Sequence, residues 1–190
     1  MSRRIALMGP QGSGKSTLAE MLVEHGGYHR HGIADGIRQV IQQAYPDPIA
    51  KDEVLELQRF SGKVRLTGRE LMQEVGAALR DVDLHFWLRI WSAGYSALSS
   101  RGIRVVVDDV RLPSEAQMLR IIEPSALVVR VYADPEVRRA RRGGSLIGSG
   151  DITELAWEGT PFDATIDTTH RTPQDSYAAL AAAIEWRANV

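Results

Sequence analysis

The chain of 190 residues contains no cysteine, which excludes disulfide bridges, thiolate nucleophiles and cysteine-ligated zinc sites. It also lacks the run of about 18 apolar residues that a membrane-spanning helix requires. The apolar stretch near the N-terminus is shorter than the apolar region of a signal peptide. We therefore expect a cytoplasmic protein that has no membrane partner.

A strong excess of positive charge is missing as well. The formal net charge is -1, whereas a protein that acts on nucleic acid usually carries a basic surface, so we expect no nucleic-acid partner. Among the 23 basic residues, three are lysines and 20 are arginines. The coding bias of a GC-rich genome explains this preference, and so does a function that binds anionic oxygens, because guanidinium binds them in bidentate fashion.

Apolar, β-branched runs alternate with amphipathic segments along the sequence. We expect strands at residues 4–8, 28–33, 103–107, 126–132 and 164–166. We expect helices at residues 15–25, 35–44, 84–98, 114–122, 135–142 and 173–188, and a further helix that begins near residue 68. This alternation predicts an α/β fold with a parallel β-sheet flanked by helices.

No linker or repeat marks a boundary, so the sequence predicts one domain over residues 1–190. The pattern is mostly helical from residue 53 to residue 100, where Thr67 and Glu70 have the spacing of a capping box. The expected parts of the domain are a core (1–44 and 101–190), a helical insertion that binds the acceptor (about 45–100) and an arginine-rich lid (about 134–160).

Residues 9–16, Gly-Pro-Gln-Gly-Ser-Gly-Lys-Ser, match every defined position of the phosphate-binding motif G-x-x-x-x-G-K-[ST]. The glycines let backbone N–H groups face phosphate oxygens, and the next helix points its positive end at them. Lys15 would reach the β- and γ-phosphates of a nucleoside triphosphate, and the Ser16 hydroxyl would bind Mg²⁺. The candidate nucleotide-binding residues are Gly12, Ser13, Gly14, Lys15, Ser16 and Thr17.

Two carboxylates, Asp108 and Asp109, follow the apolar strand expected at residues 103–107. A carboxylate in this place usually binds the Mg²⁺ ion or its waters. Either aspartate is a candidate metal ligand beside Ser16, and the alternative is that one or both cap the following turn.

Several arginines lie where an anionic acceptor would need a cationic clamp. Arg69 and Arg80 are eleven residues apart, about three helical turns, and share a helix face with Gln73. Arg111 follows the aspartate pair, at the sheet edge where ligands bind in doubly wound folds. Asp35 and Arg38 open the helix after the second strand. An ordinary surface ion pair is the alternative for each.

A second arginine cluster precedes the glycine pair at residues 143–144 and contains Arg138, Arg139, Arg141 and Arg142. Such a run is often a solvated face, but a lid that closes here would neutralise a transferring phosphoryl group and exclude water. The candidate catalytic residues are Lys15, Arg111, Arg138 and Arg142. Trp87, Trp91 and Trp157 can stack on a base, but we expect each of them to pack in the core.

These segments together resemble the bacteriophage-type deoxynucleoside monophosphate kinases, a branch of the P-loop nucleotide kinases. The resemblance rests on the P-loop, residues 34–38 (Ala-Asp-Gly-Ile-Arg), the helix from Arg69 to Arg80, Trp87 and residues 109–115 (Asp-Val-Arg-Leu-Pro-Ser-Glu). It implies transfer of the ATP γ-phosphate, with Mg²⁺, to a deoxynucleoside 5′-monophosphate (dNMP). Relatives suggest a homodimer, located in the host cytoplasm if the chain is phage-encoded.

The resemblance also implies roles for individual residues. The acceptor contacts would come from Asp35, Arg38, Arg69, Gln73, Arg80, Asp109 and Arg111, and Thr153-Glu154 resembles a Ser-Glu pair in the flap of such enzymes. The alternatives are another small-molecule P-loop kinase, for example one that acts on dephospho-CoA, an ATP-binding module without an acceptor, and a nucleic-acid binder. A GTPase is disfavoured because no Asn-Lys-x-Asp-like base reader is present.

Overall fold

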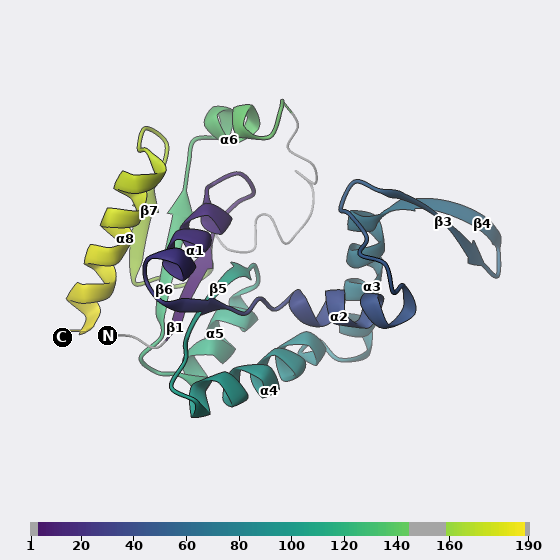
Figure 1. The fold of residues 1–190 in the computed structure, drawn as a ribbon, viewed down its shortest axis with the longest axis horizontal. Coiled ribbons are helices and arrows are strands. Elements are labelled where there is room, and N and C mark those ends of the chain that lie inside the picture. Colours follow the sequence, from purple (N-terminus) through teal and green to yellow (C-terminus); the bar gives the residue numbers. More distant parts are fainter. Residues whose placement is uncertain (1–3, 145–158, 189–190) are drawn as a thin grey trace. The chain divides into compact units, whose positions relative to one another are not determined.

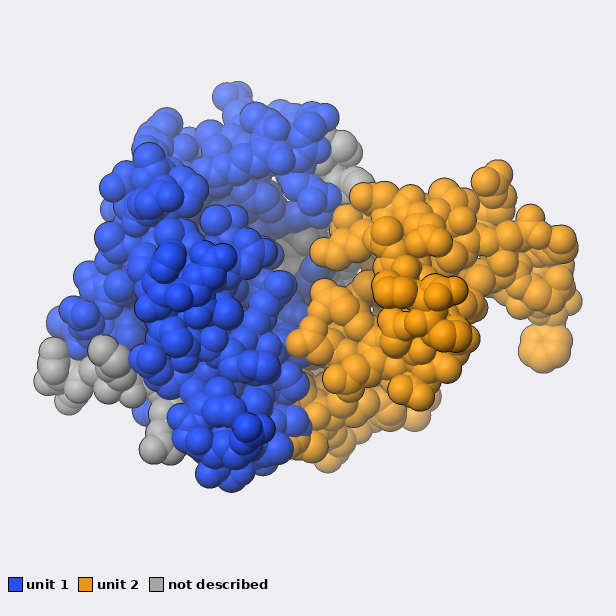
Figure 2. All heavy atoms as spheres, viewed as in Figure 1, with its two compact units in different colours: residues 1–32, 94–190 blue, residues 33–93 orange. Residues whose placement is uncertain are grey.

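The computed structural model describes residues 4–144 and 159–188. Its contacts divide the chain into two compact units, one formed by residues 1–32 and 94–190 and the other by residues 33–93 (Figure 2). The second unit begins earlier than the insertion expected at about residue 45. It includes the helix after the second strand, where Gly36 lies close to the Trp87 side chain.

The first unit is built on a five-stranded parallel sheet (Figure 1). In the order β2-β5-β1-β6-β7, its strands are Tyr28–Arg30, Arg104–Val110, Arg4–Met8, Leu127–Tyr132 and Ala164–Asp167. Its described helices are α1 (Lys15–Glu24), α5 (Pro113–Ile122), α6 (Pro135–Arg141) and α8 (Pro173–Ala188), together with the end of α4 (Phe86–Ser100). The predicted α/β class, with a parallel sheet flanked by helices, is confirmed.

Both faces of β1 are buried. Ile5 and Leu7 face a core that includes Leu18 of α1 and Leu180 of α8, all of them almost fully buried. Arg4 is also fully buried, and its Nη1 donates to the Leu119 carbonyl of α5 at 3.1 Å. Because successive side chains alternate across a strand, α1 and α8 cover one face of β1 while α5 contacts the other.

The second unit contains α2 (Asp35–Ala44), β3 (Val54–Arg59), β4 (Gly62–Thr67), α3 (Gly68–Val82) and the start of α4 (Phe86–Ser100). The expectation of mostly helix from residue 53 is wrong for residues 54–67, which form an antiparallel hairpin. Both segments alternate between apolar and polar residues, which is the period of a strand. Gly62, at φ 120°, follows the two-residue loop, and a left-handed backbone there favours glycine.

The capping box at the start of α3 is confirmed. Thr67 Oγ1 accepts a hydrogen bond from the Glu70 N–H at 3.2 Å, and a Glu70 carboxylate oxygen accepts one from the Thr67 N–H at 2.7 Å. The hydrogen bonds from the Thr67 backbone and hydroxyl lower the pKa of Glu70.

Trp87 and Trp91 are core residues, as predicted, with 1% exposure each. The indole N–H of Trp87 donates to the Gly76 carbonyl at 3.0 Å. Trp157 lies outside the described residues. Across residues 4–144 and 159–188, every helix falls short of the length and apolar character that a bilayer crossing needs.

Candidate active site

The loop between β1 and α1 has the backbone conformation of a phosphate cradle. Gly9, Gly12 and Gly14 all have positive φ, at 134°, 79° and 96°. A side chain at Gly12 would meet the Arg138 backbone at 3.0 Å, so glycine is required there for a close approach as well as for its conformation. Gly14 is the N-cap residue of α1, and it provides no side-chain hydrogen bond to the start of the helix. The first N–H groups of a helix have no partner within it and favour an anion.

Lys15 lies along this loop. Its Nζ donates to the carbonyl oxygens of Gly9 and Pro10, both at 2.7 Å. Ser16 and Thr17 follow in the first turn of α1 with exposed side chains. A compact ammonium, two hydroxyls and a helix N-terminus are the groups that bind the phosphates and the metal ion of a nucleoside triphosphate, so the residues present fit Mg²⁺–ATP.

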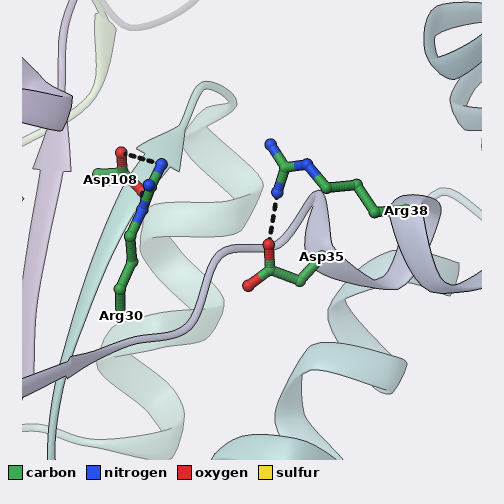
Figure 3. Close-up of polar contacts among 4 residues, drawn as sticks. All are labelled: Arg30, Asp35, Arg38 and Asp108. Carbon is green, nitrogen blue, oxygen red and sulfur yellow. Dashed lines mark hydrogen bonds and ion pairs between the residues drawn. The ribbon is translucent and has the colours of Figure 1, made fainter. Parts of the chain in front are cut away.

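Asp108 makes a bidentate ion pair with Arg30, a residue that the sequence had not singled out (Figure 3). Arg30 Nε and Nη2 donate to the two carboxylate oxygens at 2.8 and 2.7 Å. The Asp108 side chain is only 3% exposed, and that of Arg30 is 42% exposed. Arg30 lies opposite Val106 in the β2–β5 register, and Val106 packs in the core beside Leu18 of α1. Asp108 therefore lies on the α1 side of the sheet.

Asp109 has different surroundings. Its side chain is half-buried and packs against Gly32, where a Cβ atom would lie 2.8 Å from the carboxylate. The expectation that the strand ends before both carboxylates is wrong, because β5 continues to Val110. The β1–β5 register also shifts between Ala6 and Met8, so β5 accommodates an extra residue at this point. Arg111 follows β5 with an exposed side chain.

Two arginines of α6 contact the P-loop backbone. Arg138 Nη1 donates to the Gln11 carbonyl at 3.4 Å, and Arg141 Nη1 donates to the Gly12 carbonyl at 3.3 Å. Arg142, at the end of α6, is exposed. The expected lid continues beyond this helix, but residues 145–158, including Glu154, lie outside the described part of the chain.

A pocket lies beside the start of α1. Its lining includes Gly14, Thr17, Leu18, Arg141, Arg171 and Pro173. Arg141 is fixed there by hydrogen bonds from Nη1 and Nη2 to the Thr168 hydroxyl and carbonyl, at 2.9 and 2.7 Å. The sequence had not indicated Thr168 or Arg171, which follow β7. Their position after the carboxyl end of a parallel strand was the signal that could have found them.

The second unit carries five of the expected acceptor residues. Asp35 and Arg38 form an ion pair with each other at the start of α2 (Figure 3). Along α3, Gln73 is exposed and Arg80 is half-buried beside Gly76. The other two expected acceptor residues, Asp109 and Arg111, belong to the first unit.

Arg69 is held differently from an ordinary surface arginine. Its side chain is 23% exposed and forms a long ion pair with Asp52. The distance from Arg69 Nη2 to the Asp52 carboxylate oxygen is 3.7 Å. The Asp52 side chain is 88% exposed. Arg69 Nε is buried and makes no hydrogen bond within the described residues. A half-buried guanidinium with a distant, solvated counter-ion is suited to bind an anion.

The fold and the loop together define a P-loop protein with a kinase-like α/β domain. The chain belongs to the AAA domain family AAA_18, whose model matches residues 5–145. The family and its phosphate-binding loop imply ATP as the nucleotide, usually with Mg²⁺.

Solved structures of three small-molecule kinases share this fold. A sugar kinase from a Janibacter species is 15% identical, with a TM-score of 0.58, and the match covers 97% of this chain and 95% of the kinase. A gluconokinase from Sinorhizobium meliloti is 19% identical, with a TM-score of 0.55 and coverages of 98% and 94%. A shikimate kinase from Aquifex aeolicus is 15% identical, with a TM-score of 0.56 and coverages of 97% and 98%. At sequence identities this low, the structural similarity establishes the fold and leaves the substrate open. None of the curated proteins is significantly similar in sequence.

Proposed function

We propose that this protein transfers the γ-phosphate of ATP to a deoxynucleoside 5′-monophosphate, giving the diphosphate and ADP. The acceptor side rests on Arg69, which is half-buried. Its Nε makes no hydrogen bond to the residues that the structure describes, and its ion-pair partner Asp52 lies 3.7 Å away. A nucleoside phosphate would supply the anionic oxygens that such a guanidinium lacks. Arg80 lies further along the same helix and adds positive charge in the same unit.

The residues that we propose bind ATP, the phosphate donor, belong to the first unit. Backbone N–H groups from Gly12 to Thr17 and the Lys15 ammonium would hold the ATP phosphates. The pocket beside α1 would receive the nucleoside of ATP. Arg141 and Arg171 are among its lining residues, and a planar guanidinium stacks well on an aromatic base.

The proposed chemistry is an in-line displacement. An oxygen of the acceptor phosphate forms a bond to the γ-phosphorus of ATP, and the bond from that phosphorus to the β–γ bridging oxygen breaks. No general base is required, because the acceptor phosphate is already largely ionised at neutral pH. Lys15, Arg111, Arg138 and Arg142 would neutralise the charge on the transferring group, while the loop and arginines fix its position.

Metal binding is assigned in the proposal to Ser16 and Asp108, because Asp108 lies on the same side of the sheet as α1. When bound, Mg²⁺ would neutralise charge on the ATP phosphates. We expect Asp108→Asn to weaken Mn²⁺ binding in the presence of a non-hydrolysable ATP analogue about tenfold, measured by electron paramagnetic resonance. Asp109→Asn is the matched control and should change this affinity much less. An equal loss in both variants would contradict the assignment.

The acceptor is tested with a panel of small molecules in an ADP-release assay. The panel contains the four common dNMPs, dephospho-CoA, gluconate and shikimate, with the Lys15→Ala protein as the blank. We expect at least one dNMP to raise ADP release about 100-fold or more above the rate without acceptor, in line with the contribution of positioning. Stimulation by one of the other acceptors, with none by any dNMP, would reject the dNMP assignment. ADP release without any stimulation would point to an ATPase module.

A further inference from the structure

The hydroxyl of Thr168 lies where the P-loop, the end of β6 and the helix α6 meet in the first unit. Thr168 follows β7 and is only 4% exposed. Its Oγ1 lies 2.9 Å from the Ser13 carbonyl oxygen and 3.1 Å from the Tyr132 carbonyl oxygen, and it accepts a hydrogen bond from Arg141 Nη1 at 2.9 Å. Thr168 thus contacts the P-loop backbone, although it lies 155 positions from Ser13 in the sequence.

The neighbours of this hydroxyl determine where it donates its proton. A hydroxyl donates one hydrogen bond and accepts up to two. The Arg141 guanidinium only donates, so the Thr168 oxygen accepts from it. The Tyr132 carbonyl is the more distant of the two acceptors, and it already accepts the Thr168 backbone N–H at 2.8 Å. Thr168 Oγ1 therefore donates its proton to the Ser13 carbonyl.

The hydrogen bond to Ser13 also orients the next N–H of the P-loop, that of Gly14. The peptide bond between Ser13 and Gly14 is trans, and the C=O and N–H of a planar trans peptide point in opposite directions. With its carbonyl directed at Thr168, this peptide directs the Gly14 N–H away from Thr168. Within the described residues that N–H has no hydrogen-bond partner, so it is available to a phosphate oxygen.

From this geometry we infer that Thr168 is a positioning residue for ATP, which acts through the peptide between Ser13 and Gly14. By holding the Ser13 carbonyl, it keeps the Gly14 N–H directed at the site of the phosphates before the nucleotide binds. A donor that is already oriented loses little conformational freedom on binding, which strengthens the interaction. The inference rests on the ATP binding of the proposed function and does not depend on the acceptor.

A second route from Thr168 to the nucleotide runs through Arg141. Thr168 fixes this guanidinium with its hydroxyl and its carbonyl oxygen, and both residues line the pocket proposed for the nucleoside. Loss of the hydroxyl removes one of these two hydrogen bonds, whereas it removes the whole side-chain hydrogen bond to Ser13. We therefore expect the change to affect binding of the phosphates more than binding of the base.

Thr168→Val tests the role of the hydroxyl, since valine also branches at Cβ but carries no hydroxyl. We expect it to weaken the binding of Mg²⁺–ADP about tenfold, the contribution of a hydrogen bond to a charged group, measured by isothermal titration calorimetry. Thr168→Ser keeps the hydroxyl and should bind ADP within about threefold of wild type. Thr165→Val, at an exposed position of β7, is the matched control and should leave the affinity unchanged. Thermal unfolding checks that each variant is folded.

Inorganic tripolyphosphate separates the two routes, because it has the phosphates of ATP without the base. Its affinity is measured by competition with ADP, so that only binding at the nucleotide site counts. Thr168→Val should weaken the binding of tripolyphosphate and of ADP by the same factor. Weaker binding of ADP alone would assign the effect to Arg141 and the base, and it would overturn the role of the peptide between Ser13 and Gly14.

Nuclear magnetic resonance observes this peptide directly. Labelling serine with ¹³C at the carbonyl and glycine with ¹⁵N selects the glycines that follow serine, which in this sequence are Gly14, Gly62 and Gly150. ADP should shift the Gly14 N–H signal of the wild type and of Thr168→Ser. In Thr168→Val, the Ser13 carbonyl signal should differ from that of the wild type before any nucleotide is added.

The failure of the inference differs from the failure of the proposed function. An unchanged Ser13 carbonyl signal, or an unchanged affinity for ADP, in Thr168→Val would overturn the inference while the proposed function stands. If the wild type failed to bind ADP, the ATP binding of the proposed function would be rejected, and the inference with it.

Discussion

Replacement of Lys15 by alanine should lower the rate of phosphoryl transfer about a thousandfold while the protein stays folded. The Lys15 ammonium lies on the P-loop, hydrogen-bonded to the Gly9 and Pro10 carbonyls. In the proposed reaction its charge acts on oxygens that become more negative as the γ-phosphate leaves. Removal of one well-placed donor of this kind costs about 100- to 1,000-fold in rate. The measurement is ADP release with the acceptor found in the panel.

The fold should be preserved because the substitution removes two hydrogen bonds to backbone carbonyls and no core packing. The expected loss of stability is about 1–2 kcal/mol, which thermal unfolding followed by circular dichroism would detect. Lys63→Ala is the matched control, since Lys63 is an exposed lysine of the hairpin whose side chain pairs with Glu56. A folded Lys15→Ala protein that keeps more than about a tenth of the activity would refute the role of the loop in transfer.

The P-loop and the buried strands were predictable from the sequence because local patterns determine them. The glycines that the motif requires have positive φ in the structure, and the β-branched run from Val105 to Val107 is a fully buried strand. Residues 54–67 were mispredicted because they lie between helical segments. Their alternation of apolar and polar residues was the correct signal, and the structure shows it as a hairpin.

The Arg30–Asp108 ion pair could not be predicted, because it joins residues 78 positions apart in the sequence. The parallel pairing of β2 with β5 brings the two side chains to the same face. For the same reason the sequence could not separate Asp108 from Asp109. Adjacent carboxylates have identical chemistry, and only the neighbouring strand and the local register decide which one lies on the α1 side.

The role of the arginine cluster of α6 could be predicted from the sequence only in part. Composition indicated a cationic element near the phosphates, but not which side chains are fixed and which are exposed. Arg138 and Arg141 donate to P-loop carbonyls, whereas Arg142 remains exposed. Side-chain direction on a short helix depends on how the helix docks, and the docking of α6 depends on Thr168 and the P-loop, which lie far from it in sequence.

Gly9→Ala should produce the largest loss of stability among the single substitutions in the P-loop. Gly9 has φ 134°, and a Cβ atom there would lie 2.1 Å from the Val131 carbonyl oxygen and 3.2 Å from the Val131 carbonyl carbon. The obstructing atoms are backbone atoms of β6, which is paired with β1 on one side and β7 on the other. Since a strand held on both sides cannot move away easily, we expect a loss of about 3 kcal/mol or more.

Gly102→Ala separates this steric effect from backbone strain. Gly102 also has positive φ, at 73°, but no atom lies within 4 Å of its Cβ position. An alanine there should cost only about 1 kcal/mol, the penalty of a left-handed backbone. Urea unfolding of both variants gives the comparison, and nucleotide binding by Gly9→Ala should fall together with its stability. Equal losses in the two variants would mean that the close approach of the loop to β6 contributes nothing. A much larger loss of stability for Gly9→Ala would show that the loop conformation depends on its contact with the central sheet. Phosphate binding and the integrity of the core would then depend on the same glycine.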